Sequence, residues 1–199
     1  MSGSILRTGD ESARSSMYRL LGRIWLREID RDFLSQLCSS PLREAFITAG
    51  GKLPADDSGA AVEPLAIDYC QLFIGPSNHL PPYQSVWQAG QFNGKPTDSM
   101  RKFIDGCGYD VTSLPRGVML DHFGVQLGVM GHVLSKGAAL KPHSAEATVA
   151  RDVAIHFFHA HLRWAPPLLE AAAVRAGSDF YRSTISLTED FLRSEVEQR

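Results

Sequence analysis

The chain has 199 residues, of which 44% are hydrophobic, and its formal net charge at pH 7 is −2. This length is enough for one substantial core, so we expect a single domain over residues 1–199. The small net charge indicates neither a nucleic-acid partner nor a basic membrane anchor.

The cysteine pattern and the N-terminus indicate where the protein works. The three cysteines are odd in number and have no Cys-x-x-Cys spacing, which is typical of reduced thiols in a cytoplasmic protein. Residues 1–10 lack the apolar core of a signal peptide, and we expect them to be disordered. No apolar run approaches the roughly twenty residues of a membrane span, so stable membrane insertion is not expected.

Helical patterns begin close to the N-terminus. Apolar residues at three- and four-residue spacing, with arginines between them, predict a first helix that starts near residues 10–12. Asp30 or Asp32 can cap a short second helix, and Pro41 can open a third. Residues 50–62 are rich in glycine and small polar residues and are predicted to form a mobile loop.

The central stretch of the chain is a helix followed by an unusually apolar loop. Glu63-Pro64 can open this helix, and Gly75-Pro76 should end it. The loop that follows contains Leu80-Pro81-Pro82-Tyr83 and leads to Trp87. Because prolines fix an extended backbone at little entropic cost, this segment can hold apolar side chains open to a ligand.

The second half of the chain also shows helical spacing. Helices are predicted from Pro96 to an end at Gly106 and Gly108, from about 118 to 135, from 145 to 164, and from Asp179 onward, with a second mobile loop at 135–144. The helix from about 118 to 135 is apolar nearly all round, which predicts a central place in the core. No segment shows convincing alternation of period two. The sequence therefore predicts an all-α fold of about ten helices in one domain.

Five sequence blocks resemble the TorD/DmsD/NarJ family of redox-enzyme maturation chaperones. The resemblance runs from about Met17 to Leu192, and the blocks occur in the order of the family. They are L-F-I-G-P from Leu72, L-P-P-Y-Q-S-V-W from Leu80, D-H-F-G from Asp121, F-H-A-H-L-R-W-A-P from Phe158 and D-F-Y from Asp179.

The resemblance implies a cytoplasmic protein that is not an enzyme. It implies binding of the twin-arginine signal peptide, and of the precursor, of a molybdenum-cofactor oxidoreductase, with support of cofactor insertion and assembly before export. It further implies a monomer or a domain-exchanged dimer, no resident cofactor, and weak guanine-nucleotide binding whose site the sequence does not locate. The client oxidoreductase stays open, because its leader peptide sets the specificity.

A twin-arginine leader needs a receptor with both an apolar trough and an anionic partner. Asp121 can accept a bidentate hydrogen bond from arginine, and His122 can orient Asp121 or bond a peptide carbonyl. Family members carry an acidic residue, and often a proline, just before this pair, whereas this chain has Val118-Met119-Leu120. The resemblance places the trough at Tyr69, Leu72, Phe73, Pro82, Tyr83 and Trp87.

Other interpretations compete with this one. Asp121 and His122 can instead be a helix-capping carboxylate and a structural histidine, and the apolar stripe through Tyr69 can be core. His156 and His159 share a helical face, which suggests a metal-binding enzyme as an alternative. A permanent structural subunit of a redox complex is a third hypothesis.

Overall fold

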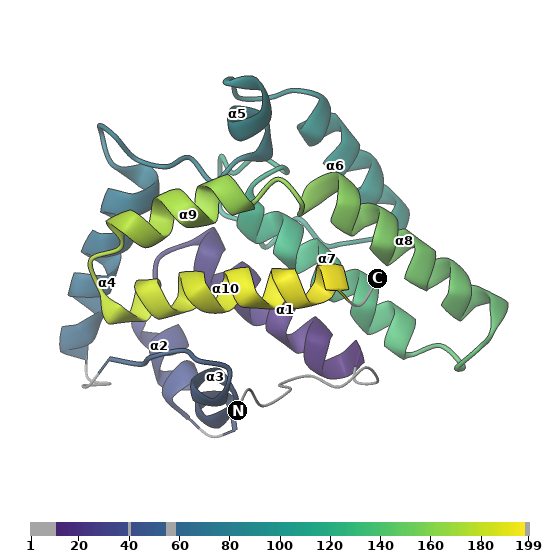
Figure 1. Cartoon of the computed structure of the whole chain (residues 1–199), viewed down its shortest axis with the longest axis horizontal. Coiled ribbons are helices and arrows are strands. Elements are labelled where there is room, and N and C mark those ends of the chain that lie inside the picture. The colour runs from purple at the N-terminus through teal and green to yellow at the C-terminus, as the bar shows by residue number, and fades with distance from the viewer. Residues whose placement is uncertain (1–10, 40, 55–58, 198–199) are drawn as a thin grey trace. The chain divides into compact units, whose positions relative to one another are not determined.

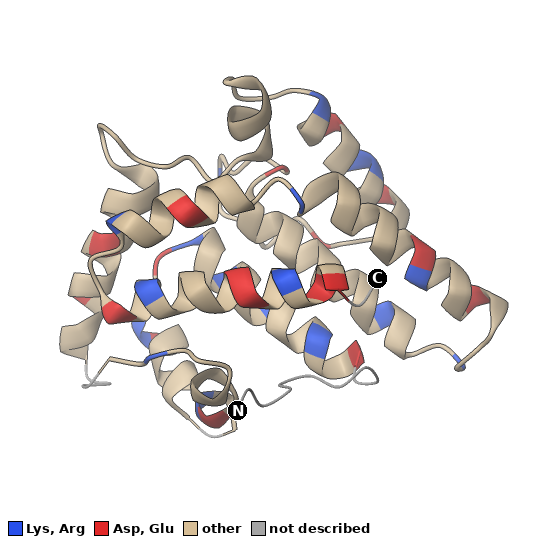
Figure 2. Cartoon of the chain, in the orientation of Figure 1, with Lys and Arg blue, Asp and Glu red and all other residues tan. Residues whose placement is uncertain are grey.

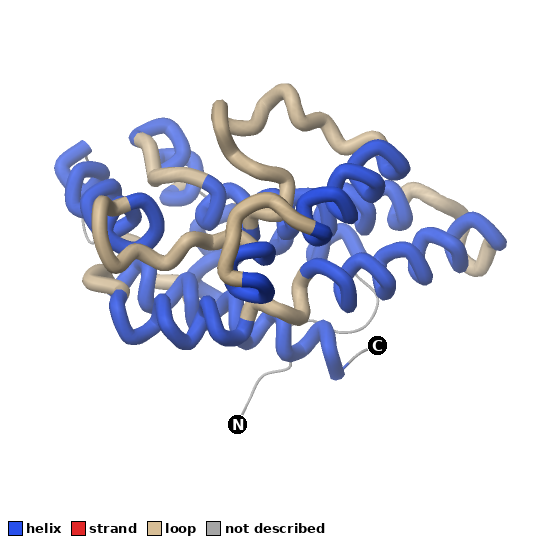
Figure 3. Tube along the Cα trace, turned by 90° about the horizontal axis from the view of Figure 1, so that it is seen from above, coloured by secondary structure: helices blue, strands red, loops and turns tan. Residues whose placement is uncertain are grey.

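The computed structural model describes residues 11–39, 41–54 and 59–197. Helices dominate this part of the chain, and none of its residues lies in a strand, apart from one isolated bridge between Tyr83 and His122 (Figure 1, Figure 3). The predicted all-α fold is therefore confirmed. The α-helices are α1 (Glu11–Leu26), α2 (Arg31–Cys38), α3 (Leu42–Thr48), α4 (Val62–Tyr69), α5 (Gln84–Ala89), α6 (Lys95–Cys107), α7 (Phe123–Ala138), α8 (Ala145–His161), α9 (Pro166–Arg175) and α10 (Asp179–Glu197). A 3-10 helix, η1 (Gly59–Ala61), precedes α4, and a π-helix, η2 (Cys70–Ile74), follows it.

The described residues divide into two compact units. The first unit contains residues 11–26 and 82–165, and therefore α1 and α5 to α8. The second unit contains the described part of 27–81 together with 166–197, and therefore α2 to α4, α9 and α10. Each unit is described by itself. The single domain predicted from the sequence stays a prediction.

Glycines bring α1 and α7 close together in the first unit (Figure 1). A Cβ atom added at Gly124 would lie 2.6 Å from the backbone nitrogen of Leu26, and one at Gly22 would lie 3.0 Å from the carbonyl oxygen of Gly124. A Cβ atom at Gly131 would lie 3.0 Å from the carbonyl oxygen of Ser15. Only glycine permits this backbone approach, so the last residue of the D-H-F-G block has a packing role.

In the second unit, Asp68 holds the turn between α9 and α10 against α4. Its carboxylate is buried and accepts hydrogen bonds from the backbone N–H groups of Gly177 (3.0 Å) and Ser178 (2.7 Å). At the next position, the buried ring of Tyr69 packs on Tyr181 of α10 with 6.1 Å between the ring centroids. This end of α4 therefore belongs to the core of the second unit.

The outer face of α10 is solvated and carries charges of both signs (Figure 2). Arg182 pairs with Asp179 at 2.8 Å, and Arg193 pairs with Glu189 at 2.6 Å and with Asp190 at 3.1 Å. Exposed pairs of this kind contribute little to stability. None of the described helices combines the length and the apolar character that a membrane crossing requires.

Several predicted helix boundaries agree with the structure. Asp30 is the N-cap of α2, and its side chain accepts a hydrogen bond of 2.8 Å from the N–H of Phe33. Gly75 ends the helical stretch that begins with α4, although the last turn of that stretch is the π-helix η2. Glycine in the left-handed conformation ends α6 at Gly108, where φ is 66°. These ends are set by local chemistry.

Two other predicted boundaries are wrong. The helix expected from about residue 118 begins at Phe123, because the backbone of His122 is extended and its imidazole caps the helix. The helix expected to reach residue 164 ends at His161, because the backbone of Leu162 leaves the helical region at φ −122° and ψ −23°.

The predicted loops also contain helical residues. The loop expected from Pro76 to Trp87 includes the first turn of α5. In the loop expected at 50–62, η1 covers 59–61 and α4 begins at Val62, while residues 55–58 lie outside the described residues. In the loop expected at 135–144, α7 continues to Ala138. The mobility of both loops stays a prediction, and residues 1–10 lie outside the described residues.

Candidate functional site

The D-H-F-G block and the L-P-P-Y-Q-S-V-W block lie against each other in the first unit. The N–H of Phe123 donates to the carbonyl of Pro82 (2.7 Å), and the N–H of Gln84 donates to the carbonyl of Asp121 (3.1 Å). These two bonds form the isolated bridge that pairs Tyr83 with His122. The bridge fixes where α5 starts.

Asp121 holds α5 to α6 through its side chain. One carboxylate oxygen accepts a hydrogen bond of 2.9 Å from the N–H of Ser85, in the first turn of α5. The other accepts one of 2.9 Å from the hydroxyl of Thr97, in the first turn of α6. The side chain of Asp121 is fully buried. A buried carboxylate is tolerated only with such partners, so in this arrangement Asp121 links the first turns of α5 and α6.

His122 is a neutral capping residue. Its Nδ1 accepts a hydrogen bond of 3.0 Å from the N–H of Gly124, and its ring contacts the ring of Tyr83 edge to face at 4.9 Å. Burial lowers the pKa of His122 to about 3, although the charge of Asp121 acts in the opposite direction. At neutral pH the imidazole is therefore uncharged, and its Nδ1 is already occupied.

A chain of buried side-chain amides connects α5, α7 and α8. The side-chain oxygen of Gln84 accepts from Nε2 of Gln126 (2.7 Å) and lies 3.0 Å from Nδ1 of His161. Because that oxygen can only accept, Nδ1 of His161 carries the proton, and Nε2 is left to accept from the hydroxyl of Ser99 at 3.0 Å. The oxygen of Gln126 accepts from the indole N–H of Trp164 at 2.9 Å.

Burial keeps the histidine of this network neutral. It lowers the pKa of His161 to about 4, and the nearby His156 acts in the same direction. The network therefore has no charged member at neutral pH. It fixes the relative positions of three helices by hydrogen bonds that have defined donors and acceptors.

A pocket of about 520 Å³ lies beside this network, within the first unit. Its walls come from α5, from the first turns of α6 and from the end of α8. The lining residues are Gln84, Ser85, Gln88, Ala89, Gln91, Gly94, Lys95, Pro96, Ser99, Ala160 and His161. Its volume falls in the range of small-molecule sites.

Three residues of the predicted trough lie in the second unit. Tyr69, Leu72 and Phe73 are 2%, 1% and 6% exposed. The rings of Tyr69 and Phe73 contact each other edge to face at 5.1 Å. In this structure these three side chains are core residues of the second unit, as the competing interpretation of the apolar stripe expects.

The other predicted trough residues lie in the first unit and differ in exposure. Pro82 is buried, whereas Tyr83 and Trp87 are half-buried. Phe92, which the sequence analysis did not select, is 52% exposed and contacts Tyr83 edge to face with 5.4 Å between centroids. Burial raises the pKa of the Tyr83 hydroxyl, and the charge of Asp121 raises it further to a lesser extent. The hydroxyl of Tyr83 therefore stays protonated at neutral pH.

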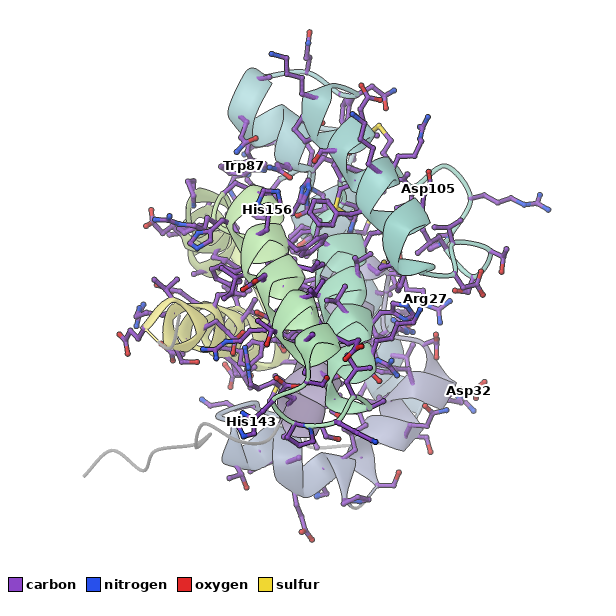
Figure 4. The ribbon with its side chains drawn as sticks, turned by 90° about the vertical axis from the view of Figure 1, so that its right-hand side faces the viewer. Arg27, Asp32, Trp87, Asp105, His143 and His156 are labelled. Carbon is purple, nitrogen blue, oxygen red and sulfur yellow. The ribbon has the colours of Figure 1, made fainter. Side chains whose placement is uncertain are left out.

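The histidines considered for a metal site are used in other contacts. His156 of α8, labelled in Figure 4, stacks on Phe103 of α6 with 5.7 Å between the ring centroids. His159 lies 3.4 Å from a guanidinium nitrogen of Arg163. Within the residues that the structure describes, no group of three or more histidine, cysteine, aspartate or glutamate side chains is arranged to hold a metal ion.

Sequence reasoning missed the residues of the amide network. Gln84 and Trp164 lie inside two of the quoted blocks. Gln126 is the one polar side chain in the first nine residues of α7, and a buried amide needs hydrogen-bond partners. That contrast is the one local signal that could have identified it.

The fold and this site define a class of protein. It is an all-α protein with a small pocket and a buried, neutral polar network. Partly exposed aromatic side chains lie on α5 and in the segment that follows α5. The sequence profile of the nitrate reductase delta subunit family matches residues 34–170. The chain therefore belongs to this family, in which the TorD/DmsD/NarJ resemblance also places it.

Two relatives agree with that membership. The chain is 29% identical over 140 residues to the chaperone protein TorD of Shewanella sp. (strain ANA-3), in a match that covers 61% of this chain and 66% of TorD. The chain thus spans just under two thirds of that relative's length. A crystal structure from Archaeoglobus fulgidus, described as that of a redox enzyme maturation protein, has the same fold with a TM-score of 0.56 and 17% identity. That match covers 94% of this chain and 96% of the other.

Proposed function

We propose that the protein is a maturation chaperone that binds the twin-arginine signal peptide and precursor of a molybdenum-cofactor oxidoreductase. It supports cofactor insertion and assembly in the cytoplasm before export, and it does not itself catalyse a reaction. Family membership and the TorD relative support the chaperone role. The leader peptide and the molybdoenzyme client come from the family resemblance.

One structural observation carries the peptide-binding part of the proposal. Tyr83, Trp87 and Phe92 leave aromatic surface exposed on the first unit, next to a backbone that the Asp121 hydrogen bonds hold in place. Tyr83 is the residue that precedes α5, and Trp87 lies within α5. Aromatic side chains on a fixed backbone provide most of the binding energy at peptide interfaces, because little entropy is lost when they are covered.

Asp121 and His122 enter the proposal as positioning residues. Both oxygens of Asp121 already accept hydrogen bonds, and the side chain has no exposed surface to offer an arginine. Their effect on a peptide would pass through Ser85 and Tyr83, which they hold in place. Direct pairing of Asp121 with the leader's arginines stays a prediction that requires α5 to move. Tyr69, Leu72 and Phe73 are not part of the exposed surface that supports the proposal.

The first experiment identifies the client. Tagged full-length protein is purified from its own cytosol, and the co-purifying proteins are identified by mass spectrometry. An unprocessed oxidoreductase precursor that retains its twin-arginine leader is the expected result. Recovery of only the mature enzyme, in a stable stoichiometric complex, would instead support the permanent-subunit alternative. A preparation with stoichiometric bound metal and no precursor would support the His156/His159 alternative.

The second experiment tests the surface. The leader found in the first experiment is labelled and titrated by fluorescence anisotropy. Replacing Trp87 by alanine should weaken binding by roughly tenfold or more, as expected for an aromatic anchor. The control is Val149→Ala, which changes an exposed apolar residue on α8 (61% exposed) and should leave the affinity unchanged. Equal affinities of the two variants would refute the placement of the peptide surface.

A further inference from the structure

The pocket in the first unit contains a buried polar group that the hydrogen-bond network does not use. Ser85 is 1% exposed and lines the pocket, and its hydroxyl has no hydrogen-bond partner among the described residues. A buried hydroxyl without a partner costs free energy, and such groups are uncommon in folded proteins. A ligand in the pocket would supply the missing partner.

Several of the other polar groups of the pocket are hydrogen-bond donors, and Gln91 offers both a donor and an acceptor. The oxygen of Gln88 already accepts from Nε2 of Gln84 (3.1 Å), so its own amide N–H groups are the part left free. The hydroxyl of Ser99 is directed to Nε2 of His161, which removes that nitrogen as an acceptor. Lys95 is exposed, and no carboxylate of the described chain pairs with it. These groups call for a ligand that accepts hydrogen bonds.

The start of α6 adds the backbone N–H of Lys95 to the same pocket, whereas Pro96 has no N–H. Gly94, Lys95 and Pro96 line it, and Gly94 caps this 13-residue helix without a side-chain hydrogen bond. The free N–H groups and the dipole of a helix N-terminus favour negative charge. No aspartate or glutamate lines the pocket. The nearest carboxylate in this network, Asp121, is fully buried and is bonded to Ser85 N–H and Thr97.

We propose that this pocket binds a small organic molecule through its carboxylate group. A single lysine with neutral donors matches one negative charge, whereas a phosphate would require more cationic groups. The volume of about 520 Å³ exceeds the space that a carboxylate fills, so the ligand has an organic body. That body would lie against Ala89, Pro96 and Ala160, which are the apolar part of the lining.

Three probes with the same ring and different head groups test this inference. The full-length 15N-labelled protein is titrated with benzoate, benzamide and phenyl phosphate at constant ionic strength, and amide resonances are followed by NMR. Benzoate should cause saturable shifts at Ser85, Lys95 and Ser99. Benzamide should bind roughly tenfold more weakly, because it lacks the charge-assisted hydrogen bonds. If benzamide binds as tightly as benzoate, the inference that the pocket recognises a carboxylate is refuted. If phenyl phosphate binds more tightly than benzoate, the pocket recognises a phosphate instead.

Two pairs of variants separate the pocket from general surface charge. Lys95→Gln should weaken benzoate binding severalfold, whereas Lys102→Gln, on the same helix but outside the pocket, should not. Ser85→Ala should weaken benzoate without loss of the folded NMR spectrum, since it removes an unpartnered hydroxyl. The proposed site would be overturned if Lys95→Gln and Lys102→Gln weakened benzoate binding equally. It would also be overturned if the benzoate-induced shifts persisted in both Lys95→Gln and Ser85→Ala. None of these titrations requires the signal peptide, so their outcome is independent of the chaperone proposal.

Discussion

Replacing Gly124 by alanine tests the close packing of α1 on α7. The new Cβ atom would lie 2.6 Å from Leu26 N, 2.7 Å from Leu26 Cα and 2.9 Å from the carbonyl oxygen of Gly22. All three are backbone atoms, so no side-chain rotation relieves the overlap. Because carbon atoms pack best at about 3.5–4.0 Å, the two helices must separate by roughly 1 Å.

The magnitude follows from two opposing effects. Overpacking of this kind costs about 1–3 kcal/mol, or more when backbone must move. Alanine is a better helix former than glycine by about 1 kcal/mol, which offsets part of the cost. Because the overlap is with backbone atoms, the upper end of that range applies, and the free energy of unfolding should fall by about 2 kcal/mol after the offset. Urea denaturation measures this fall, with comparison of both midpoint and slope.

Two other glycines provide a graded control. A Cβ atom at Gly106 of α6 meets nothing within 4 Å, so Gly106→Ala should stabilise the protein by up to about 1 kcal/mol. At Gly128 the nearest atom is the hydroxyl of Tyr109 at 2.6 Å, the end of a side chain that can move. Gly128→Ala should therefore fall between the other two. If Gly124→Ala were as stable as Gly106→Ala, the backbone approach described here would be refuted.

Three further predictions concern the buried polar groups. Asp121→Asn should lower the free energy of unfolding by about 1–3 kcal/mol. The reason is that the carboxylate accepts from two donors, Ser85 N–H and Thr97 O–H, whereas an amide has only one oxygen to accept with. An unchanged urea midpoint would contradict those bonds. Ser85→Ala should leave the free energy of unfolding unchanged or raise it by up to about 1 kcal/mol, because the hydroxyl that is removed has no hydrogen-bond partner. A clear loss of stability would show that the Ser85 hydroxyl does have a partner. The pKa values of His122 and His161 are lowered to about 3 and about 4, so the unfolded chain binds more protons than the folded chain below about pH 6.5. This contribution to stability is complete above pH 6.5 and is lost as the pH falls toward 3. The melting temperature should fall over that range, and His161→Gln should make the fall shallower; a melting temperature independent of pH from 6.5 to 4 would count against both buried imidazoles.

Local chemistry made many of the helix boundaries predictable. Asp30 accepts from the backbone three residues on, and Gly75 ends the stretch that begins with α4. Such ends depend on residues within one turn, which the sequence displays directly. The apolar character of α7 on nearly all sides likewise predicted its central place in a core.

The start of α5 depends on residues far away in the chain. Its first turn is fixed by the carboxylate and the carbonyl of Asp121, 36 or more residues further on. The segment itself reads as a proline-rich loop, so nothing local predicts the helix. The same bonds decide that Asp121 is buried, which a motif match alone leaves open.

The sequence by itself determined the fold class, most of the helices and, through five short blocks, the family. These follow from periodicity, caps and motifs, all of which act over a few residues. Only the tertiary structure decided which motif residues are accessible: Trp87 and Tyr83 keep exposed surface, whereas Asp121 and Tyr69 are buried. It also decided that Gln84 meets His161, 77 residues away, beside a pocket that contains the unpartnered hydroxyl of Ser85. The physical reason is that burial and hydrogen-bond partners are set by segments distant in the chain, which no local pattern encodes.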